Sequence, residues 1–311
     1  MISVAFVTVA LLAAATTTTA PPRPRPKPAV RASIRWEPTV AAAMAKAKAV
    51  RQPVMIDFWA EWCGYCHELD RTTYVDPTVV RMSRGFVSVK VNAEGSKEEQ
   101  KLAGRYLVSG LPTIAFLSPA GRQIWRLGGF VPPAAFRENL VEMQKAAEQV
   151  LAWEAALEKD ANDVAALTGL ALQQFGEMQA VAREDDQGRA PLAMVSDTED
   201  LLARAAAGDK DSPAADRKRV RRTMALLHAA QGRNEPTEKL LKEALAVQPP
   251  GPEDADAEVL LGNLYLQQGK NDVARTMLQK VVKNYPGTPA ARRAQSQLTR
   301  LGDAAGEGGK P

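Results

Sequence analysis

Residues 54–67 read VMIDFWAEWCGYCH, and this stretch decides both the fold and the chemistry that we expect. Residues 54–60 form a nearly continuous apolar run, which is typical of a strand buried on both faces. The run leads directly into CGYC at residues 63–66, which has the C-x-x-C spacing of a thiol–disulfide redox centre. With His67 added, the same letters spell C-x-x-C-H, the attachment pattern of a c-type haem. The flanking sequence has to decide between these two interpretations.

The segments on either side of this stretch alternate between strand and helix patterns. The expected elements are a strand at 33–36, a helix to about Val50, strands at 54–60 and 86–94, helices at 63–73 and 96–106, a hairpin of 113–117 with 122–127, and a helix from Pro132 to about Gln149. Alternating strands and helices that end in a hairpin predict an α/β sandwich with a mixed sheet. The C-x-x-C motif then follows the carboxyl end of the central strand, where open α/β sheets place their sites.

The C-x-x-C motif predicts different roles for its two cysteines. The attacking species in disulfide exchange is a thiolate, so one cysteine needs a lowered pKa. Cys63 is expected at a helix N-terminus, where unpaired N–H groups and the helix dipole favour the anion. Cys66, one turn further on, is expected to resolve the mixed disulfide.

A buried acid beside the motif is the expected proton acceptor. Asp57 is the one charged residue of the apolar strand, and burial raises a carboxyl pKa into a useful range. It would take the proton of Cys66 through a water molecule. Lys90, in the neighbouring strand, is expected to partner Asp57. The alternatives are a purely structural buried acid and an ordinary lysine facing the sheet edge.

The residues then point to a family. DFWAEWCGYC at 57–66 together with GLPT at 110–113 resembles thioredoxin. The longer run from Ile34 to Val80 is similar to the thioredoxin-like C-terminal domain of the periplasmic thiol:disulfide interchange transporter and its stand-alone relatives. The likeness covers about residues 33–148.

This resemblance implies a substrate groove next to the cysteines. Pro112 would be a cis-proline that faces them, and the resemblance also supports the roles of Asp57 and Lys90. The residues implied to contact substrate are Trp62, Gly64, Tyr65, Leu111 and Thr113. Thioredoxin has Gly-Pro between its cysteines where this chain has Gly64-Tyr65, which leaves the direction of electron flow open.

The haem and zinc alternatives explain less of the sequence. Covalent haem needs an enclosing pocket and usually a second axial ligand, and the other histidine lies in a predicted helical repeat. A zinc site of this type needs more than the two thiolates that the chain contains. We therefore expect no cofactor and no metal.

Composition fits an exported globular protein. A chain of 311 residues with 45% hydrophobic residues is long enough for roughly two domains. The net charge of +4 is small, and no clustered basic surface is evident, so nucleic acid is not an expected partner. Both cysteines lie in one C-x-x-C motif, which leaves none for a structural disulfide framework.

The N-terminus has the pattern of a secretory signal. An apolar run from Val4 to Ala15 is too short to span a bilayer comfortably, and small residues follow it. We expect residues 1–20 to be a cleaved signal peptide, with an uncleaved membrane tether as the alternative. The segment PPRPRPKPAVR at 21–31 predicts an extended spacer, or alternatively a docking peptide for a proline-binding module. The periplasm or another exported location follows from these patterns.

Strand patterns disappear beyond residue 150 and a helical repeat replaces them. Residues 257–287, AEVLLGNLYLQQGKNDVARTMLQKVVKNYPG, fit the tetratricopeptide pattern, in which small residues such as Gly262 and Ala274 let two helices approach closely. A weaker copy begins 37 residues earlier, and a degenerate third unit starts near Asn162. Such repeats form a concave surface suited to peptides or protein partners.

These observations combine into one predicted organisation. The expected parts are a signal peptide at 1–20, a linker at 21–32, a thioredoxin-like domain at 33–149, a helical repeat domain at 150–303 and a disordered tail at 304–311. The leading hypothesis is an exported thiol–disulfide oxidoreductase, a reductase or an interchange enzyme, whose repeats recruit substrate or partner proteins. Its substrates would be proteins with disulfides or thiols, and a membrane or soluble thiol would supply electrons.

Three other hypotheses remain from the sequence. The first is a tetratricopeptide adaptor with a vestigial redox domain. The second is the c-type haem carrier, and the third is an intracellular redox co-chaperone.

Overall fold

The computed structural model describes residues 33–184 and 192–307. The predicted signal peptide at 1–20 and the predicted linker at 21–32 lie outside the described residues, as do the last four residues of the predicted tail.

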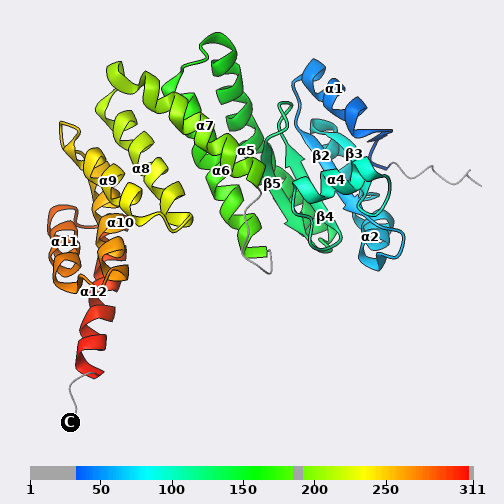
Figure 1. Cartoon of the computed structure of the whole chain (residues 1–311). Coiled ribbons are helices and arrows are strands. Elements are labelled where there is room, and N and C mark those ends of the chain that lie inside the picture. The colour runs from blue at the N-terminus through cyan, green and yellow to red at the C-terminus, as the bar shows by residue number, and fades with distance from the viewer. Residues whose placement is uncertain (1–32, 185–191, 308–311) are drawn as a thin grey trace, which may run out of the picture. The chain divides into compact units, whose positions relative to one another are not determined.

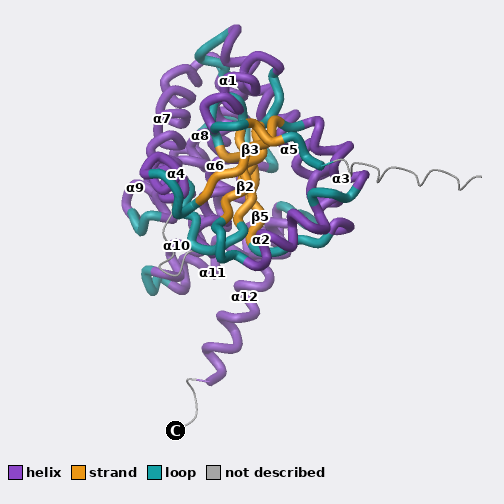
Figure 2. The backbone as a smooth tube through the Cα atoms, turned by 90° about the vertical axis from the view of Figure 1, so that its right-hand side faces the viewer, coloured by secondary structure: helices purple, strands orange, loops and turns teal. Residues whose placement is uncertain are grey.

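Five strands form one mixed sheet in the order β1-β3-β2-β4-β5. The strands are β1 (Trp36–Glu37), β2 (Val54–Trp59), β3 (Val87–Asn92), β4 (Thr113–Leu117) and β5 (Gln123–Gly128). β3 pairs parallel with both β1 and β2, whereas β4 pairs antiparallel with both β2 and β5. The α/β fold with a mixed sheet and a final hairpin is therefore confirmed, and Figure 2 shows the sheet enclosed by helices.

Helices cover both faces of the sheet. They are α1 (Val40–Val50), α2 (Gly64–Glu68), the π-helical turn η1 (Leu69–Thr73), α3 (Pro77–Met82), the 3₁₀ turn η2 (Ser83–Gly85), α4 (Lys97–Arg105) and α5 (Pro133–Lys159). Apolar residues of α1 and α4 share one cluster with β2, β3 and β4. Residues of η1, α3 and α5 form a second cluster against other side chains of the sheet.

The central strand β2 is buried on both of its faces. Ile56 and Phe58 belong to the cluster under α1 and α4, and Met55 belongs to the cluster under α3 and α5. Side chains alternate along a strand, so Asp57 lies on the same side as Met55. Asp57 has no exposed surface. The fold thus places one carboxyl group inside the domain, on the strand that leads into the C-x-x-C motif.

Helix α5 is longer than the sequence predicts. The expected end near Gln149 has neither glycine nor proline to stop the helix, which continues to Lys159. Val150 is fully buried and packs in a cluster that also contains residues of α6 (Val164–Glu184). The predicted domain boundary at 149/150 falls within this helix, and the division of the chain at that position stays a prediction.

All described elements after α5 are helical, as the sequence predicts (Figure 1). Following α6, they are α7 (Leu192–Gly208), the 3₁₀ turn η3 (Asp209–Asp211), α8 (Ala214–Ala230), α9 (Asn234–Ala246), α10 (Glu253–Gln267), α11 (Asn271–Asn284) and α12 (Pro289–Glu307). The turns after α8 and α10 match, because Gly232 and Gly269 adopt φ values of 70° and 74°. A positive φ suits glycine, which has no Cβ.

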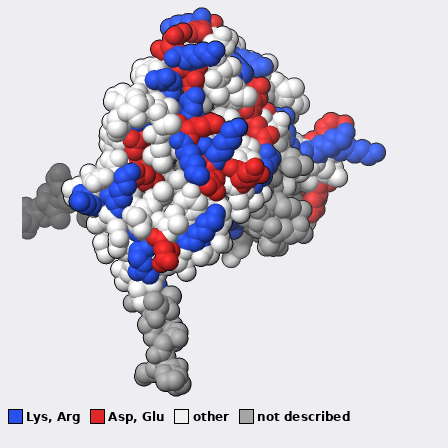
Figure 3. All heavy atoms as spheres, turned by 60° about the vertical axis from the view of Figure 1, so that its left-hand side comes forward, with Lys and Arg blue, Asp and Glu red and all other residues white. Residues whose placement is uncertain are grey.

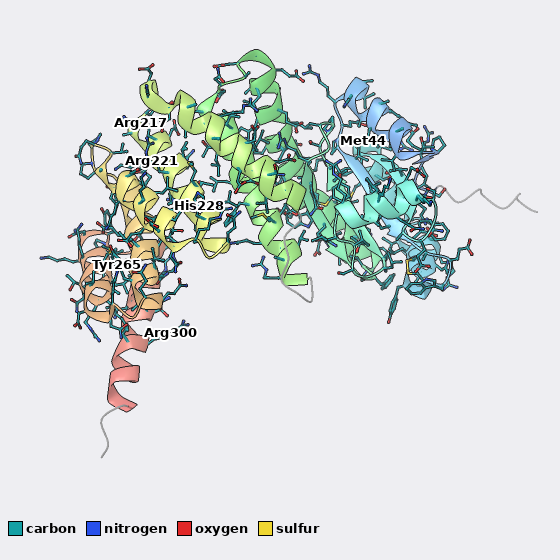
Figure 4. All side chains as sticks on the ribbon, viewed as in Figure 1. Met44, Arg217, Arg221, His228, Tyr265 and Arg300 are labelled. Atoms are coloured by element: carbon teal, nitrogen blue, oxygen red, sulfur yellow. A yellow bond between two sulfur atoms is a disulfide. The ribbon has the colours of Figure 1, made fainter. Side chains whose placement is uncertain are left out.

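The repeat at 257–287 packs as its pattern predicts. A Cβ atom on Gly262 would lie 3.1 Å from the side chain of Leu278 of α11, so a larger residue there would require Leu278 to shift, and glycine allows this close approach of α10 and α11. Ala274 is fully buried at the same interface. Tyr265, labelled in Figure 4, donates a hydrogen bond from its hydroxyl to Glu238 of α9 at 3.1 Å.

The surface carries charges of both signs. Figure 3 shows Lys and Arg close to Asp and Glu across the face that it presents. Several of these are ion pairs between helices, such as Arg222 of α8 with Asp256 of α10 at 2.9 Å. Within the described part of the chain, no helix is both long enough and apolar enough to span a membrane.

Candidate redox site

Cys63 and Cys66 form a disulfide at the start of α2. Cys63 is the N-cap residue of this helix, and its sulfur accepts a hydrogen bond from the backbone N–H of Cys66 at 3.1 Å. The same donor would stabilise a thiolate on Cys63 after reduction. Cys66 is fully buried, whereas the two residues between the cysteines are exposed. Cys63 is therefore the sulfur nearer to the surface.

Asp57 and Lys90 lie next to each other on neighbouring strands, as the sequence predicts. They are register partners on the parallel strands β2 and β3, and Lys90 Nζ lies 3.3 Å from Asp57 Oδ2. Lys90 is shared, because its Nζ also donates a hydrogen bond to Asp70 Oδ1 at 2.6 Å. The rings of Trp36 and Trp59 lie within 5.3 and 5.4 Å of the same nitrogen, in cation–π geometry.

Burial raises the pKa of Asp57 from 3.8 to about 6, and the nearby Lys90 limits the rise. A carboxyl group in this range can both accept and return a proton near neutral pH. Tyr74 is buried beside it, and burial together with the Asp57 charge raises the pKa of Tyr74 well above its usual value. Neither carboxylate oxygen of Asp57 has a hydrogen-bond partner among the described residues. Such an atom is costly to bury unless water or substrate completes it.

The loop before β4 contacts the cysteines through Leu111. The Leu111–Pro112 peptide bond is cis, as the resemblance implies. Leu111 packs against the cluster of Ala60, Cys63 and Cys66. Thr113 is buried, and its hydroxyl donates a hydrogen bond to the Gly110 carbonyl at 2.8 Å. The side chain of Thr113 thus braces the loop.

Aromatic side chains surround the disulfide at the surface. Trp62 and Tyr65 are 68% and 66% exposed, although both are large and apolar. Trp62 donates a hydrogen bond from Nε1 to Glu94 at 2.9 Å. Tyr65 stacks on Phe130 with ring centroids 6.2 Å apart. Gly64, between Cys63 and Tyr65, has no atom within 4 Å of the position of a Cβ.

His67 has an interaction that differs from haem ligation. Its Nε2 lies 2.8 Å from the carbonyl oxygen of Glu61, and its ring packs edge-on against Trp59. Both cysteine sulfurs are bonded to each other rather than available for thioethers. Among the residues that the structure describes, no three His, Cys, Asp or Glu side chains are arranged to hold a metal ion.

Four residues at this site were not predicted from the sequence: Asp70, Tyr74, Glu94 and Phe130. Asp70 is four residues after Cys66, and this helical spacing is a signal that could have placed it near the site. Tyr74 is the C-cap residue of η1, and its interaction with Asp57 arises only in the folded structure. Glu94 and Phe130 come from loops distant in sequence, which no local pattern connects to the motif.

The fold and the geometry of the site agree with comparisons to known proteins. Residues 40–144 match the thioredoxin-like domain family. This segment is a thioredoxin-like domain. Residues 228–298 match the tetratricopeptide repeat family, so the predicted combination of the two is confirmed.

Curated relatives match about a third of this chain. The thiol:disulfide interchange protein DsbD of Vibrio vulnificus (strain CMCP6) is 35% identical over 100 residues, which are 31% of this chain and 17% of that protein. The DsbD protein of Klebsiella pneumoniae is 36% identical over 103 residues, which are 32% of this chain and 17% of the relative. The chain thus spans about a sixth of the length of these relatives.

Solved structures of a thioredoxin and of a DsbD domain align with a similar share of the chain. A thioredoxin from Thermus thermophilus is 38% identical, with 35% of this chain and 86% of that chain covered and a TM-score of 0.33. The oxidised C-terminal domain of DsbD from Neisseria meningitidis is 30% identical, with coverages of 33% and 90% and a TM-score of 0.30.

Proposed function

We propose that this chain is an exported thiol–disulfide oxidoreductase that works through Cys63 and Cys66. The observation that carries the proposal is the Cys63–Cys66 disulfide at the start of α2, in a domain that also buries the Asp57–Lys90 pair. The thioredoxin-like match over residues 40–144 and the interchange proteins among its relatives support the same activity. We assign the catalytic roles to Cys63, Cys66 and Asp57.

The first half of the reaction starts from the reduced pair. The Cys63 thiolate attacks one sulfur of a substrate disulfide, forms a mixed disulfide and releases the other substrate sulfur as a thiolate. The backbone N–H of Cys66 stabilises the attacking anion. Leu111 and the cis Pro112, next to the cysteines, hold the substrate chain.

The second half regenerates the disulfide seen in the structure. Cys66 gives its proton to Asp57 through water and attacks the Cys63 sulfur, which releases the second substrate thiol. Two electrons have then passed from the cysteine pair to the substrate. Lys90 holds the charge of Asp57 while Asp70 balances the lysine. A membrane or soluble thiol donor reduces the pair again.

The proposal also covers the direction of electron flow, the role of the repeat helices and the role of the first 32 residues. The reducing or interchange direction is favoured, because the interchange proteins are the relatives that match. The repeat helices recruit substrate or partner proteins through their concave surface. The first 32 residues direct export to the periplasm, either through a cleaved signal or as a tether.

Reduction of insulin by the purified chain in the presence of dithiothreitol tests the activity. We expect the wild type to accelerate precipitation of the insulin B chain and Cys63→Ser to lose the acceleration. Equal activity in both proteins would contradict the proposal and leave the adaptor hypothesis. The reduction potential of the pair then fixes the direction, with a value near about −270 mV expected for a reductase and about −120 mV for an oxidant.

A further inference from the structure

Trp62 and Tyr65 are the two most exposed large apolar side chains of the described residues, and both lie next to the redox cysteines in the chain. Most large apolar side chains of this domain are buried in its clusters. An exposed apolar patch of this kind marks a contact surface more often than a packing defect. Because it adjoins Cys63, any polypeptide that exchanges a disulfide there must lie against it.

Tyr65 has a fixed partner, which is Phe130. The two rings are nearly parallel, at 20° with centroids 6.2 Å apart, in the offset arrangement that aromatic pairs prefer. Phe130 is half-buried and packs on the cluster beneath α3 and α5. The stacked pair, here called the aromatic shelf, thus presents apolar surface next to the cysteines, because Tyr65 lies between Cys63 and Cys66 in the chain and is largely exposed.

The loop that carries Phe130 is held on two sides. Gly129 has a φ of 76°, and its N–H donates a hydrogen bond to the Pro112 carbonyl at 2.8 Å. On the other side, the hydroxyl of Thr73 donates to the Val131 carbonyl at 2.8 Å. The aromatic shelf is therefore tied both to the cis-proline loop and to the helical segment after Cys66. Its position is set before a substrate arrives, which lowers the cost of binding.

The surface around Trp62 is acidic. Glu94 accepts the hydrogen bond of the Trp62 indole, and the backbone N–H of Glu94 donates to Asn92 Oδ1 at 3.0 Å. Glu61, directly before Trp62, is also exposed. Neither carboxylate has an ion-pair partner within the described part of the chain. A substrate with a basic side chain would supply the missing charge.

We propose that Phe130, acting with Tyr65, determines which substrates this site accepts. The preferred substrate is an extended polypeptide segment that carries a large apolar side chain next to its reacting cysteine and a basic side chain nearby. The apolar side chain packs on the aromatic shelf, and the basic side chain pairs with Glu61 or Glu94. This inference rests on the proposed thiol–disulfide activity, since disulfide exchange at Cys63 is what brings the substrate cysteine to the shelf.

Four synthetic peptides test the proposal. They share one length and one cysteine held in a disulfide with glutathione, and they combine Phe or Gly beside the cysteine with Arg or Glu three positions away. We measure the second-order rate constant for their reduction by the full chain, which is first reduced with dithiothreitol and then freed of it, under single-turnover conditions. The wild type should prefer the Phe/Arg peptide over the Gly/Glu peptide by about tenfold or more, the range that a single apolar contact supplies.

Variants separate the shelf from the rest of the site. Phe130→Ala should reduce the preference for Phe over Gly to about twofold or less, and Phe130→Leu should keep most of it because it retains apolar volume. Glu61→Gln combined with Glu94→Gln should lower the preference for Arg over Glu. Val141→Ala, at a 43% exposed apolar position of α5, serves as the matched control and should keep the wild-type preferences.

The outcomes distinguish the inference from the proposed function. Equal rates for the Phe and Gly peptides in the wild type would overturn the role of the shelf, as would Phe130→Ala slowing all four peptides by the same factor. Phe130→Leu guards against a folding defect, because it should fold whether or not the alanine variant does. If the reduced wild type reduces none of the peptides, the proposed function itself fails.

Discussion

The thioredoxin-like domain and the repeat helices differ in how closely their buried acidic side chains are paired with cations. In the helices, each of two buried acids has a cation close by: Lys218 lies 2.7 Å from Asp254, and Lys280 lies 2.5 Å from Glu258. In the thioredoxin-like domain, the buried Asp57 lies 3.3 Å from Lys90, and Lys90 lies closer to Asp70 than to Asp57. The repeat helices neutralise their buried acids, whereas the redox site leaves one only partly compensated.

This difference indicates what each region is built for. A closely paired acid contributes to packing and has no reason to change its protonation state. A buried acid that is only partly compensated lowers the free energy of unfolding. Such acids are found where a proton has to move during the reaction. Arg221 of α8, labelled in Figure 4, follows the first pattern, since it pairs with the buried Asp209.

The largest effect should come from breaking a closely compensated pair. Asp254→Asn removes the counter-ion of Lys218, which is only 3% exposed. A buried cation without its partner typically costs about 3–5 kcal/mol, so we expect the free energy of unfolding to fall by that amount. Urea denaturation at pH 7 measures the change. A loss below about 1 kcal/mol would mean that the pair contributes little to packing.

An Asp-to-Asn substitution at the redox site should raise the free energy of unfolding instead of lowering it. The pKa of Asp57 is about 6 in the folded chain against 3.8 as a free group, so the folded state binds the proton more tightly. Stability from this group is complete below pH 3.8 and is lost as pH rises through about 6. The side chain introduced by Asp57→Asn cannot ionise. We therefore expect the free energy of unfolding to rise by up to about 3 kcal/mol at pH 7 and to change little at pH 4.

Urea denaturation of both proteins between pH 4 and pH 8 measures this effect. The two stability curves should converge at acidic pH and separate as pH rises. The variant should also reduce insulin about tenfold or more slowly, because the proton acceptor of Cys66 is gone. Parallel stability curves would show that Asp57 is not strained by its burial.

A smaller effect tests close packing in the helices without any charge. A Cβ atom on Gly169 of α6 would lie 2.3 Å from the ring of Trp153, so Gly169→Ala forces a shift. Overpacking of this kind costs about 1–3 kcal/mol. Gly176 lies in the same helix with no atom within 4 Å of a Cβ, and Gly176→Ala should stabilise the chain by about 0.5–1 kcal/mol. Thermal unfolding of the two variants side by side measures the contrast.

The sequence predicted the core of the site because the evidence there is local. C-x-x-C after a buried strand places Cys63 at a helix start, and an acid within an apolar run is buried wherever the strand is central. Lys90 was found because neighbouring parallel strands bring their equivalent positions together. The register of Asp57 with Lys90 confirms this.

What the sequence missed depends on tertiary structure. Asp70 competes for Lys90 because η1 places its carboxylate 2.6 Å away, a distance that no spacing rule supplies. Phe130 lies in the loop after β5, and only the folded domain brings this loop close to Tyr65. Helix α5 extends beyond Gln149 because its buried continuation, with Val150, packs against α6.

Trapping of the mixed disulfide tests the central claim most directly. Reduced Cys66→Ser lacks the resolving thiol, so incubation with a disulfide-containing protein such as insulin should accumulate a covalent adduct. Non-reducing electrophoresis and peptide mass spectrometry should place the new disulfide on Cys63, and reduced Cys63→Ser should form no such adduct. An adduct through Cys66 in Cys63→Ser, or none in either variant, would contradict the assignment of Cys63 as the attacking thiolate.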